Sequence, residues 1–177
     1  STVVPNLRCS IPVEGIIVHG ISAVIATAHQ KIGVVGGYRT IESRAYGQPL
    51  RKRGIEVVEQ VAQSLSAFVE AGQLSGSEVE SALERIVEPL IDMDAVLLAC
   101  THYPALLPLF RRALPKVKLI DPVERLVDHI IITWPGLNRA GLGQTVVWTT
   151  GCTEQTKLSA RQAFGVELEH VNRWEKP

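Results

Sequence analysis

Short apolar runs alternate with helical patterns along the whole chain. The runs are rich in Val, Ile and Leu and have the length of single strands. They predict strands at residues 11–18, 31–36, 55–59, 95–99, 117–120, 145–150 and 166–171. Apolar residues at helical spacing predict helices at residues 22–30, 40–50, 63–71, 77–88, 105–114, 123–132 and 154–164, and residues 136–143 are expected to form a loop.

The clearest of these helices begins at Ser77. Ser77 and Glu80 have the spacing of a capping box, in which each side chain binds a backbone N–H at the start of a helix. Apolar residues from Val79 to Ile91 then fall on one face at a period of 3.6 residues. Pro89 is expected to end or kink this helix near Glu88, because proline cannot donate the next backbone hydrogen bond.

The order of these elements predicts the fold class. Continuous Val/Ile/Leu strands, each followed by a helix, are typical of parallel strands that helices cover on both faces. We therefore expect an α/β fold with a doubly wound parallel sheet. Ligands of such folds bind at the carboxyl ends of the strands, so candidate chemistry is sought at the strand-to-helix junctions.

Composition and charge narrow the classes of function. The chain has 177 residues, 18 Lys and Arg against 18 Asp and Glu, and 46% hydrophobic residues. A balanced charge argues against nucleic acid or an anionic membrane as the main partner. No apolar run approaches the roughly 18–20 residues that span a bilayer. Three cysteines argue against a disulfide framework and suit the reducing cytoplasm.

The first candidate site is the junction at residues 97–104. Cys100 leaves a buried strand, and Pro104 is typical of the first turn of a helix. Unpaired N–H groups at a helix start favour a thiolate, and His102, two residues further on, could hydrogen-bond or protonate a reacting group. Thr101 offers a hydroxyl and a backbone N–H to a carboxylate. The alternative is a buried structural cysteine followed by a neutral, packed histidine.

The second junction, residues 33–40, weakly resembles a dinucleotide-binding turn. It lacks G-x-G-x-x-G spacing, although Glu56 lies about where an acid that binds a ribose would fall. A nucleotide-binding oxidoreductase using NAD or NADP is therefore one alternative. The simpler interpretation is a tight glycine turn after which Thr40 caps a helix or binds an anion.

The remaining cysteines and the histidines give weaker signals. Cys152 also precedes a predicted helix but has no neighbouring histidine, and Cys9 precedes a strand with no chemical neighbour. The five histidines show no spacing typical of a metal site, so no metal is expected. His129, in an apolar helix, is interpreted as a core residue.

The segment Ala99-Cys100-Thr101-His102-Tyr103-Pro104 resembles a motif of the glutamate racemase family within the aspartate/glutamate racemase superfamily. Family members carry Gly-Cys-Thr-His-Tyr-Pro, so Ala99 replaces a glycine. Other stretches agree in order and spacing. They are residues 11–15 (Ile-Pro-Val-Glu-Gly), 32–36 with Thr40, Ser43 and Tyr46, 69–72 (Val-Glu-Ala-Gly) and 119–122 (Leu-Ile-Asp-Pro).

The resemblance implies a cofactor-independent enzyme that interconverts L- and D-glutamate and supplies D-glutamate for peptidoglycan. Two cysteines on opposite faces of the substrate would exchange protons with its α carbon. Cys100 would be one of them, assisted by His102, with Glu70 orienting or charge-balancing that histidine. Thr101 and Thr40 would bind the carboxylate or amine of glutamate. Without the resemblance, Glu70 is interpreted as a solvated helix residue and Thr40 as a helix cap.

The sequence also departs from the family pattern. Family members carry an Asp-Ser-Gly segment and an Ala-Cys-Asn-Thr-Ala-Ser segment with the first catalytic cysteine, and neither is present here. The resemblance implies that residues 23–123 form a complete second α/β lobe carrying Cys100. Residues 1–22 and 124–177 would be the remainder of a first racemase-like lobe. We therefore predict that the 177-residue chain alone does not racemise glutamate.

Three rival functions remain at this stage. The first is another racemase of the superfamily, acting on aspartate or a hydantoin. The second is the nucleotide-binding oxidoreductase described above, and the third is a non-catalytic binding module. The family resemblance also suggests a cytoplasmic protein and a possible homodimer.

Overall fold

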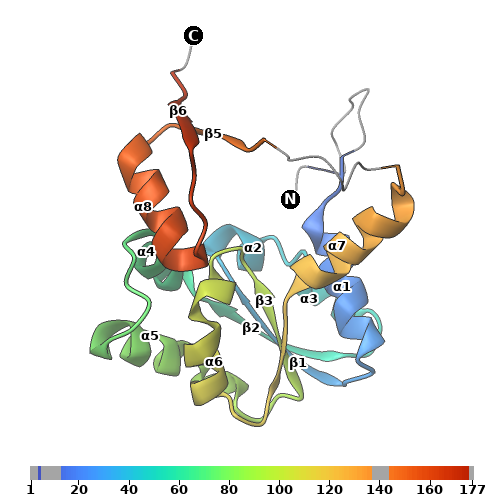
Figure 1. The fold of residues 1–177 in the computed structure, drawn as a ribbon. Helices are drawn as coiled ribbons and strands as arrows, with labels where there is room; N and C mark the ends of the chain where they lie inside the picture. The colour runs from blue at the N-terminus through green and yellow to red at the C-terminus, as the bar shows by residue number, and fades with distance from the viewer. Residues whose placement is uncertain (1–3, 5–12, 137–143, 176–177) are drawn as a thin grey trace.

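Four parallel strands form the central sheet of the protein. The computed structural model describes residue 4 and residues 13–136 and 144–175. The strand order is β2-β1-β3-β4, and every neighbouring pair is parallel (Figure 1). The strands are β1 (Lys31–Gly36), β2 (Glu56–Val61), β3 (Ala95–Ala99) and β4 (Lys118–Ile120). This order reverses direction between β1 and β3, which defines a doubly wound sheet and confirms the predicted fold class.

Helices cover both faces of the sheet (Figure 1). On one face lie α4 (Gln63–Glu70), α5 (Ser77–Val87), the 3₁₀ turn η3 (Tyr103–Leu106) and α6 (Leu107–Ala113). On the other face lie α1 (Ile16–Ala26), α2 (Tyr38–Glu42) and α3 (Gly47–Arg51), and α7 (Pro122–Thr133) packs against α1.

Neighbouring residues of β1 and β3 pack into two separate hydrophobic cores, one on each face of the sheet. Val35 and Leu98 belong to the core beneath α4, α5 and α6, whereas Val34 and Leu97 belong to the core beneath α1 and α3. All four side chains are buried. Because side chains of a strand alternate between faces, a strand covered on both sides must be apolar at every position. The continuous apolar runs of the sequence follow from this arrangement.

The strand predicted at residues 11–18 is wrong. Residues 11 and 12 lie outside the described part of the chain, residues 13–15 have no regular structure, and α1 begins at Ile16. Ile17, Ile21 and Val24 pack against the sheet, and their spacing is that of one helical face. The helical period therefore outweighs the strand preference of the β-branched residues.

Three helix predictions also need correction. The helix predicted at 22–30 is part of α1, which starts at Ile16 and ends at Ala26. The helix predicted at 40–50 is divided into α2 and α3, and Arg44 between them has a left-handed φ of 52°. The capping box is only half formed: Gly76, not Ser77, is the N-cap of α5, and its N–H donates to Glu80 Oε1 at 3.4 Å. The predicted end is confirmed, because α5 stops at Val87 and Pro89 lies in a 3₁₀ turn, η2 (Glu88–Leu90).

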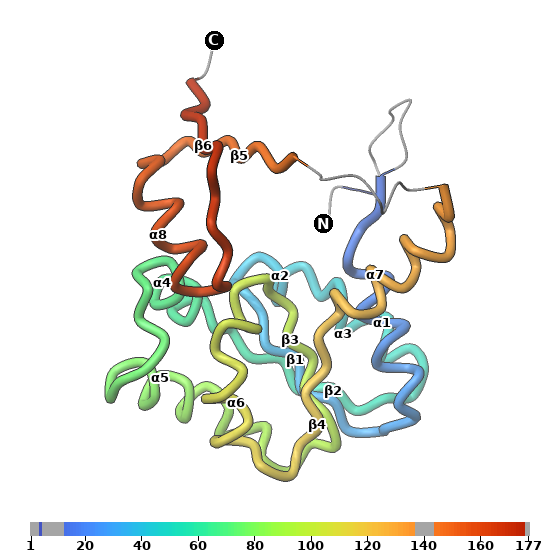
Figure 2. The backbone as a smooth tube through the Cα atoms, viewed as in Figure 1, coloured from blue at the N-terminus to red at the C-terminus, as the bar shows by residue number. Residues whose placement is uncertain are grey.

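The C-terminal part forms a small strand–helix–strand unit. Strands β5 (Val146–Thr149) and β6 (His170–Arg173) pair in parallel, joined by α8 (Thr153–Phe164). The strand predicted at 166–171 begins only at His170, because Gly165 ends α8 in a left-handed conformation and an irregular stretch follows. Helix α8 lies beside α4 (Figure 2), and Ser159 Oγ donates to the backbone carbonyl of Glu70 at 2.8 Å.

The boundaries of the predicted lobes fall within helices. The boundary at 22/23 lies in α1 and the boundary at 123/124 lies in α7. The division into a complete and a partial lobe stays a prediction. The predicted loop at 136–143 lies outside the described residues from position 137 onward. Among the described residues, no helix has the length and apolar character needed to cross a membrane.

Candidate active site

The candidate site lies where the strand order reverses, at the carboxyl ends of β1 and β3. Gly36 and Ala99 pair at the end of the register between these strands. Cys100 follows Ala99 directly, and Thr40 lies four residues beyond Gly36 in α2. A crevice at this point of a doubly wound sheet is where ligands of such folds bind.

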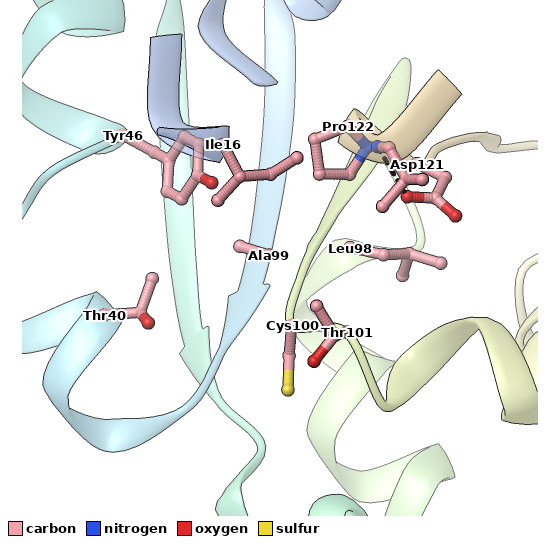
Figure 3. A pocket seen from close by; sticks show the side chains of 10 residues that line it. Ile16, Thr40, Tyr46, Leu98, Ala99, Cys100, Thr101, Asp121 and Pro122 are labelled. Atoms are coloured by element: carbon pink, nitrogen blue, oxygen red, sulfur yellow. Dashed lines mark hydrogen bonds between the residues drawn. The ribbon is translucent and has the colours of Figure 1, made fainter. Parts of the chain in front are cut away.

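A cavity of about 200 Å³ opens at this edge of the sheet. Figure 3 shows Thr40 on one side of it and Cys100 with Thr101 on the other. Its lining residues are Ile16, Thr40, Tyr46, Leu98, Ala99, Cys100, Thr101, Asp121, Pro122 and Val123. The cavity therefore combines one thiol, two threonine hydroxyls and one carboxylate with apolar walls, a composition that suits a small polar ligand.

The apolar wall of the cavity depends on a close approach of α1. A Cβ atom at Gly20 would lie only 2.7 Å from Tyr46 Cε1 and 3.2 Å from Pro122 Cβ. Glycine at this position therefore lets α1 approach the two residues that line the cavity. Tyr46 is buried, and this burial raises the pKa of its phenol to about 12.

The thiol of Cys100 is half-buried and contacts two polar side chains. Its Sγ lies 3.5 Å from His102 Nδ1 and 3.6 Å from Ser66 Oγ. Ser66 is a buried residue of α4. The helix-dipole argument for Cys100 is not supported, because a 3₁₀ turn follows the loop and α6 begins only at Leu107. Instead, one imidazole and one hydroxyl hold the sulfur.

Glu70 binds the other nitrogen of His102. His102 Nε2 lies 3.3 Å from Glu70 Oε1, so the three side chains form a continuous thiol–imidazole–carboxylate series. Ser66 and Glu70 are one turn apart in α4 and therefore lie on the same face of it. In the tautomer with a proton on Nε2, the ring donates a hydrogen bond to Glu70, and Nδ1 can accept one from the thiol of Cys100.

Tyr103 anchors the loop that carries Cys100. Its ring is fully buried, and its hydroxyl donates to the backbone carbonyl of Ala62 at 2.9 Å. Burial, and secondarily the nearby Cys100, raises the pKa of this phenol above its ordinary value. Tyr103 is thus a neutral structural residue that ties the loop to the start of α4.

The structure brings together the residues that the sequence singled out, with one addition. Cys100, His102 and Glu70 are in contact, and Thr40 and Thr101 line the same cavity. Thr40 does not cap α2, because Gly37 is the N-cap and Thr40 lies inside the helix. Ser66 was not predicted; its spacing of four residues from Glu70 in a helix is the only signal that could have indicated it.

The other candidates lie apart from this site. Cys152 is exposed at the N-cap of α8 and does not line the cavity. Glu56 pairs with Lys31 at the amino end of β1, whereas Gly36 lies at the carboxyl end. Six residues of strand separate the two ends by roughly 16 Å at about 3.3 Å per residue. Glu56 therefore cannot act as a ribose-binding acid beside the glycine turn, and the dinucleotide-binding hypothesis loses its support.

Cys9 lies outside the described residues, and the interpretation of His129 as a core residue is wrong. The side chain of His129 is 40% exposed and its Nε2 lies 3.4 Å from Glu14 Oε1. The apolar residues around His129 in the sequence face α1 only in part, since Val127 and Ile131 are exposed as well.

The fold and the site define an α/β protein with a cysteine thiol in contact with an imidazole at the strand-order reversal. The chain belongs to the Asp/Glu/hydantoin racemase family, whose model matches residues 6–130. A glutamate racemase of Exiguobacterium sibiricum is 40% identical over 139 residues, which cover 71% of this chain and 51% of that protein. Glutamate racemase 1 of Caldanaerobacter subterraneus subsp. tengcongensis is 36% identical over 122 residues, covering 66% and 46%. The chain thus spans about half the length of the curated relatives it matches.

Solved structures agree with this assignment. The glutamate racemase isoform RacE1 from Bacillus anthracis superposes with a TM-score of 0.84 at 26% identity, covering all of this chain and 70% of that one. A glutamate racemase from Thermus thermophilus, solved with beta-chloro-D-alanine, gives 0.78 at 27% identity, covering 98% and 66%. The enzyme from Francisella tularensis, solved with D-glutamate, shares the fold with a TM-score of 0.83 at 24% identity, covering 98% and 68%.

Proposed function

We propose that Cys100 is one of the two acid–base groups of a cofactor-independent glutamate racemase. The contact series Cys100–His102–Glu70 at the cavity carries this proposal. Relatives named glutamate racemases at 36–40% identity support glutamate as the substrate. By the family resemblance, the reaction would supply D-glutamate for peptidoglycan in the cytoplasm, and the enzyme would act as a homodimer.

The proposed chemistry is a proton transfer at the α carbon. His102 accepts the thiol proton of Cys100, and the resulting thiolate removes the proton from Cα of glutamate. The electron pair of the broken C–H bond remains on the substrate, and a proton donated to the opposite face gives the other enantiomer. Thr40 and Thr101 would bind the substrate carboxylate or amine, because hydroxyl and N–H donors stabilise the charge that develops in a cofactor-free site.

Inversion requires a second acid on the face of the substrate opposite Cys100. Cys152 does not supply it, because it does not line the cavity. A single thiol can remove a proton and return one from solvent to the same face. We therefore expect Cys100 by itself to exchange the α hydrogen of one enantiomer of glutamate, and inversion to require a second acid that the described residues around the cavity do not supply as a cysteine.

The test follows α-deuterium incorporation into L- and D-glutamate in D₂O by mass spectrometry, with circular dichroism as the measure of inversion. Exchange should depend on Cys100 and be lost in Cys100→Ser, whereas Cys152→Ser should behave as the wild type. Exchange that persists in Cys100→Ser would overturn the role of this thiol. Inversion by the chain itself would overturn the requirement for a second group from elsewhere.

An independent test measures substrate binding without turnover. Iodoacetamide should alkylate Cys100, and bound glutamate should slow that alkylation, as read by peptide mass mapping. Thr40→Val and Thr101→Val should weaken the protection, while alkylation of the exposed Cys152 serves as the internal control. Protection by aspartate or a hydantoin but not by glutamate would assign the chain to another racemase of the family.

A further inference from the structure

A second cluster of functional side chains lies away from the Cys100 cavity. Glu14 precedes α1, His19 belongs to α1, and His129 belongs to α7. Figure 1 shows α1 and α7 side by side, and they pack against each other. Glu14 Oε2 lies 3.3 Å from His19 Nε2, and Glu14 Oε1 lies 3.4 Å from His129 Nε2. None of the three residues lines the Cys100 cavity.

The three side chains bring three possible ligand atoms close together. One ligand atom from each residue lies within 4.8 Å of the others, and the two imidazole rings have centroids 4.7 Å apart. An ion with ligands at about 2.0–2.1 Å in tetrahedral geometry places neighbouring ligand atoms roughly 3.3–3.4 Å apart. Each contact of Glu14 has about this length, and the two contacts use different carboxylate oxygens. A bound ion would therefore draw one of these oxygens toward both imidazoles.

We propose that Glu14, His19 and His129 form a binding site for a divalent first-row transition ion such as Zn²⁺. Two imidazoles and one carboxylate are ligands that Zn²⁺ accepts, and imidazole is disfavoured by Mg²⁺ and Ca²⁺. Water would complete the coordination at the fourth position. The site lies where α1 packs against α7, and it does not depend on the proposed racemase chemistry.

The surroundings of the cluster support ligation. The ring of His19 is buried, so its orientation is fixed by packing. The hydroxyl of Thr133, one turn beyond His129 in α7, lies 3.4 Å from both ring nitrogens of His129. It can accept a hydrogen bond from the nitrogen that does not bind metal, which is how outer partners orient ligating histidines.

Sequence spacing could not indicate this site. Glu14 and His19 are five residues apart, and His129 is 115 residues from Glu14. Only the packing of α1 against α7 brings the third ligand to the first two. A bound ion would join the segment before α1 to α7 and would stabilise the folded state, because the unfolded chain does not hold the three ligands together.

Trp134 provides a specific optical probe of the site. Its ring centroid lies 6.3 Å from that of His129, and the chain has three tryptophans. In a Trp148→Phe, Trp174→Phe background, Trp134 is the only tryptophan. Co²⁺ bound at the site should quench its fluorescence. Replacing all three cysteines by serine in the same chain removes thiolates as competing metal ligands.

Zn²⁺ affinity and stoichiometry are then measured by calorimetry, and Co²⁺ binding by fluorescence and visible absorption. We expect one ion per chain. Glu14→Gln and His129→Ala should each weaken Zn²⁺ binding by more than the roughly 10- to 100-fold that loss of an outer partner costs. These two residues are partly exposed, so the variants are expected to fold, and far-UV circular dichroism verifies this.

His29→Ala is the matched control, because His29 lies in the turn after α1 and outside the cluster. It should bind Zn²⁺ as the parent does. Absence of binding by the parent at millimolar Zn²⁺, or affinity unchanged in both Glu14→Gln and His129→Ala, would overturn the proposal. The cluster would then be a carboxylate–imidazole hydrogen-bond network only.

Discussion

At the scale of single residues, His102 is the side chain that contacts both the thiol of Cys100 and the carboxylate of Glu70. The side chain of Glu70 is 67% exposed and that of His102 is 31% exposed. Solvent screens an ion pair as open as this one, and such pairs contribute about 0.2–1 kcal/mol. In the proposed mechanism His102 exchanges a proton with the sulfur of Cys100, so we expect its contribution to be larger than that of Glu70.

We predict that His102→Ala lowers the α-exchange rate by about 10²-fold or more, the usual range for loss of a general acid–base group. Glu70→Gln should lower it by no more than about fivefold, the equivalent of roughly 1 kcal/mol. Glu78→Gln, an exposed change in α5, should leave the rate unchanged. Equal losses for His102→Ala and Glu70→Gln would contradict this ranking.

Ser66 gives a second prediction at this scale. Its hydroxyl can donate to the sulfur of Cys100, and hydrogen bonds to an ionised acceptor are stronger than neutral ones. Ser66→Ala should therefore slow alkylation of Cys100 several-fold at neutral pH. Ser64→Ala, an exposed serine in the same helix, is the control and should have no effect. Unchanged alkylation in Ser66→Ala would leave Ser66 as a packing residue.

At the scale of secondary structure, Asp94 ties the starts of two strands together. Asp94 lies immediately before β3, and Lys31 is the first residue of β1. The Oδ2 atom of Asp94 accepts hydrogen bonds from the backbone N–H groups of Lys31 at 2.8 Å and of Gln30 at 3.1 Å. These hydrogen bonds, that of Lys31 first, hold the pKa of the Asp94 carboxyl below its usual value of 3.8. The carboxylate of Asp94 therefore fixes the start of β1 relative to the start of β3.

Because the pKa of the Asp94 carboxyl is lowered, the contribution of Asp94 to the free energy of unfolding should decrease as the pH falls. A carboxyl group with a lower pKa in the folded state stabilises that state fully above the unfolded pKa, and the effect is lost as pH falls through the folded pKa. Asp94→Ala should therefore unfold at lower urea concentration than the wild type at pH 7, and the gap should narrow below about pH 4. Asp92→Ala is the control two residues away. A gap that is constant from pH 7 to pH 3 would show that charge is not the cause.

The elements differ in how far the sequence predicts them. The strands 31–36 and 95–99 are confirmed residue for residue, because burial on both faces leaves an unmistakable apolar run. The start of α1 is missed because Ile16, Ile17 and Val18 suit a strand locally, and only packing against the sheet selects the helix. In the site, Cys100 and its neighbours in sequence are predicted from a local motif. The contacts of Ser66 with Cys100 and of His129 with Glu14 depend on tertiary packing, which no local pattern encodes.

At the scale of the whole molecule, one sheet supports two cores. Phe110 of α6 is fully buried in one of them, and Leu50 of α3 is fully buried in the other. Strands β1 and β3 contribute side chains to both, so neither core can be lost while the sheet remains intact.

We therefore predict that removing a core side chain on either face of the sheet shifts one common unfolding transition. Phe110→Ala should lower the free energy of unfolding by about 3–5 kcal/mol and Leu50→Ala by about 2–5 kcal/mol. Urea unfolding followed by far-UV circular dichroism, together with amide hydrogen exchange of β1 and β3, measures both. Leu158→Ala, at an exposed position of α8, is the control. Separate transitions for the two faces in either variant would contradict a shared sheet.

The hydrogen bond from Ser159 to the carbonyl of Glu70 links the far end of the chain to the carboxylate beside His102. A fragment trimmed to the four-stranded sheet would keep β1 to β4 and Cys100, yet the last turn of α4 would lose the hydrogen bond that α8 provides. We therefore expect a shortened protein to need α8 to keep Glu70 in place beside His102, although α8 lies outside the four-stranded sheet.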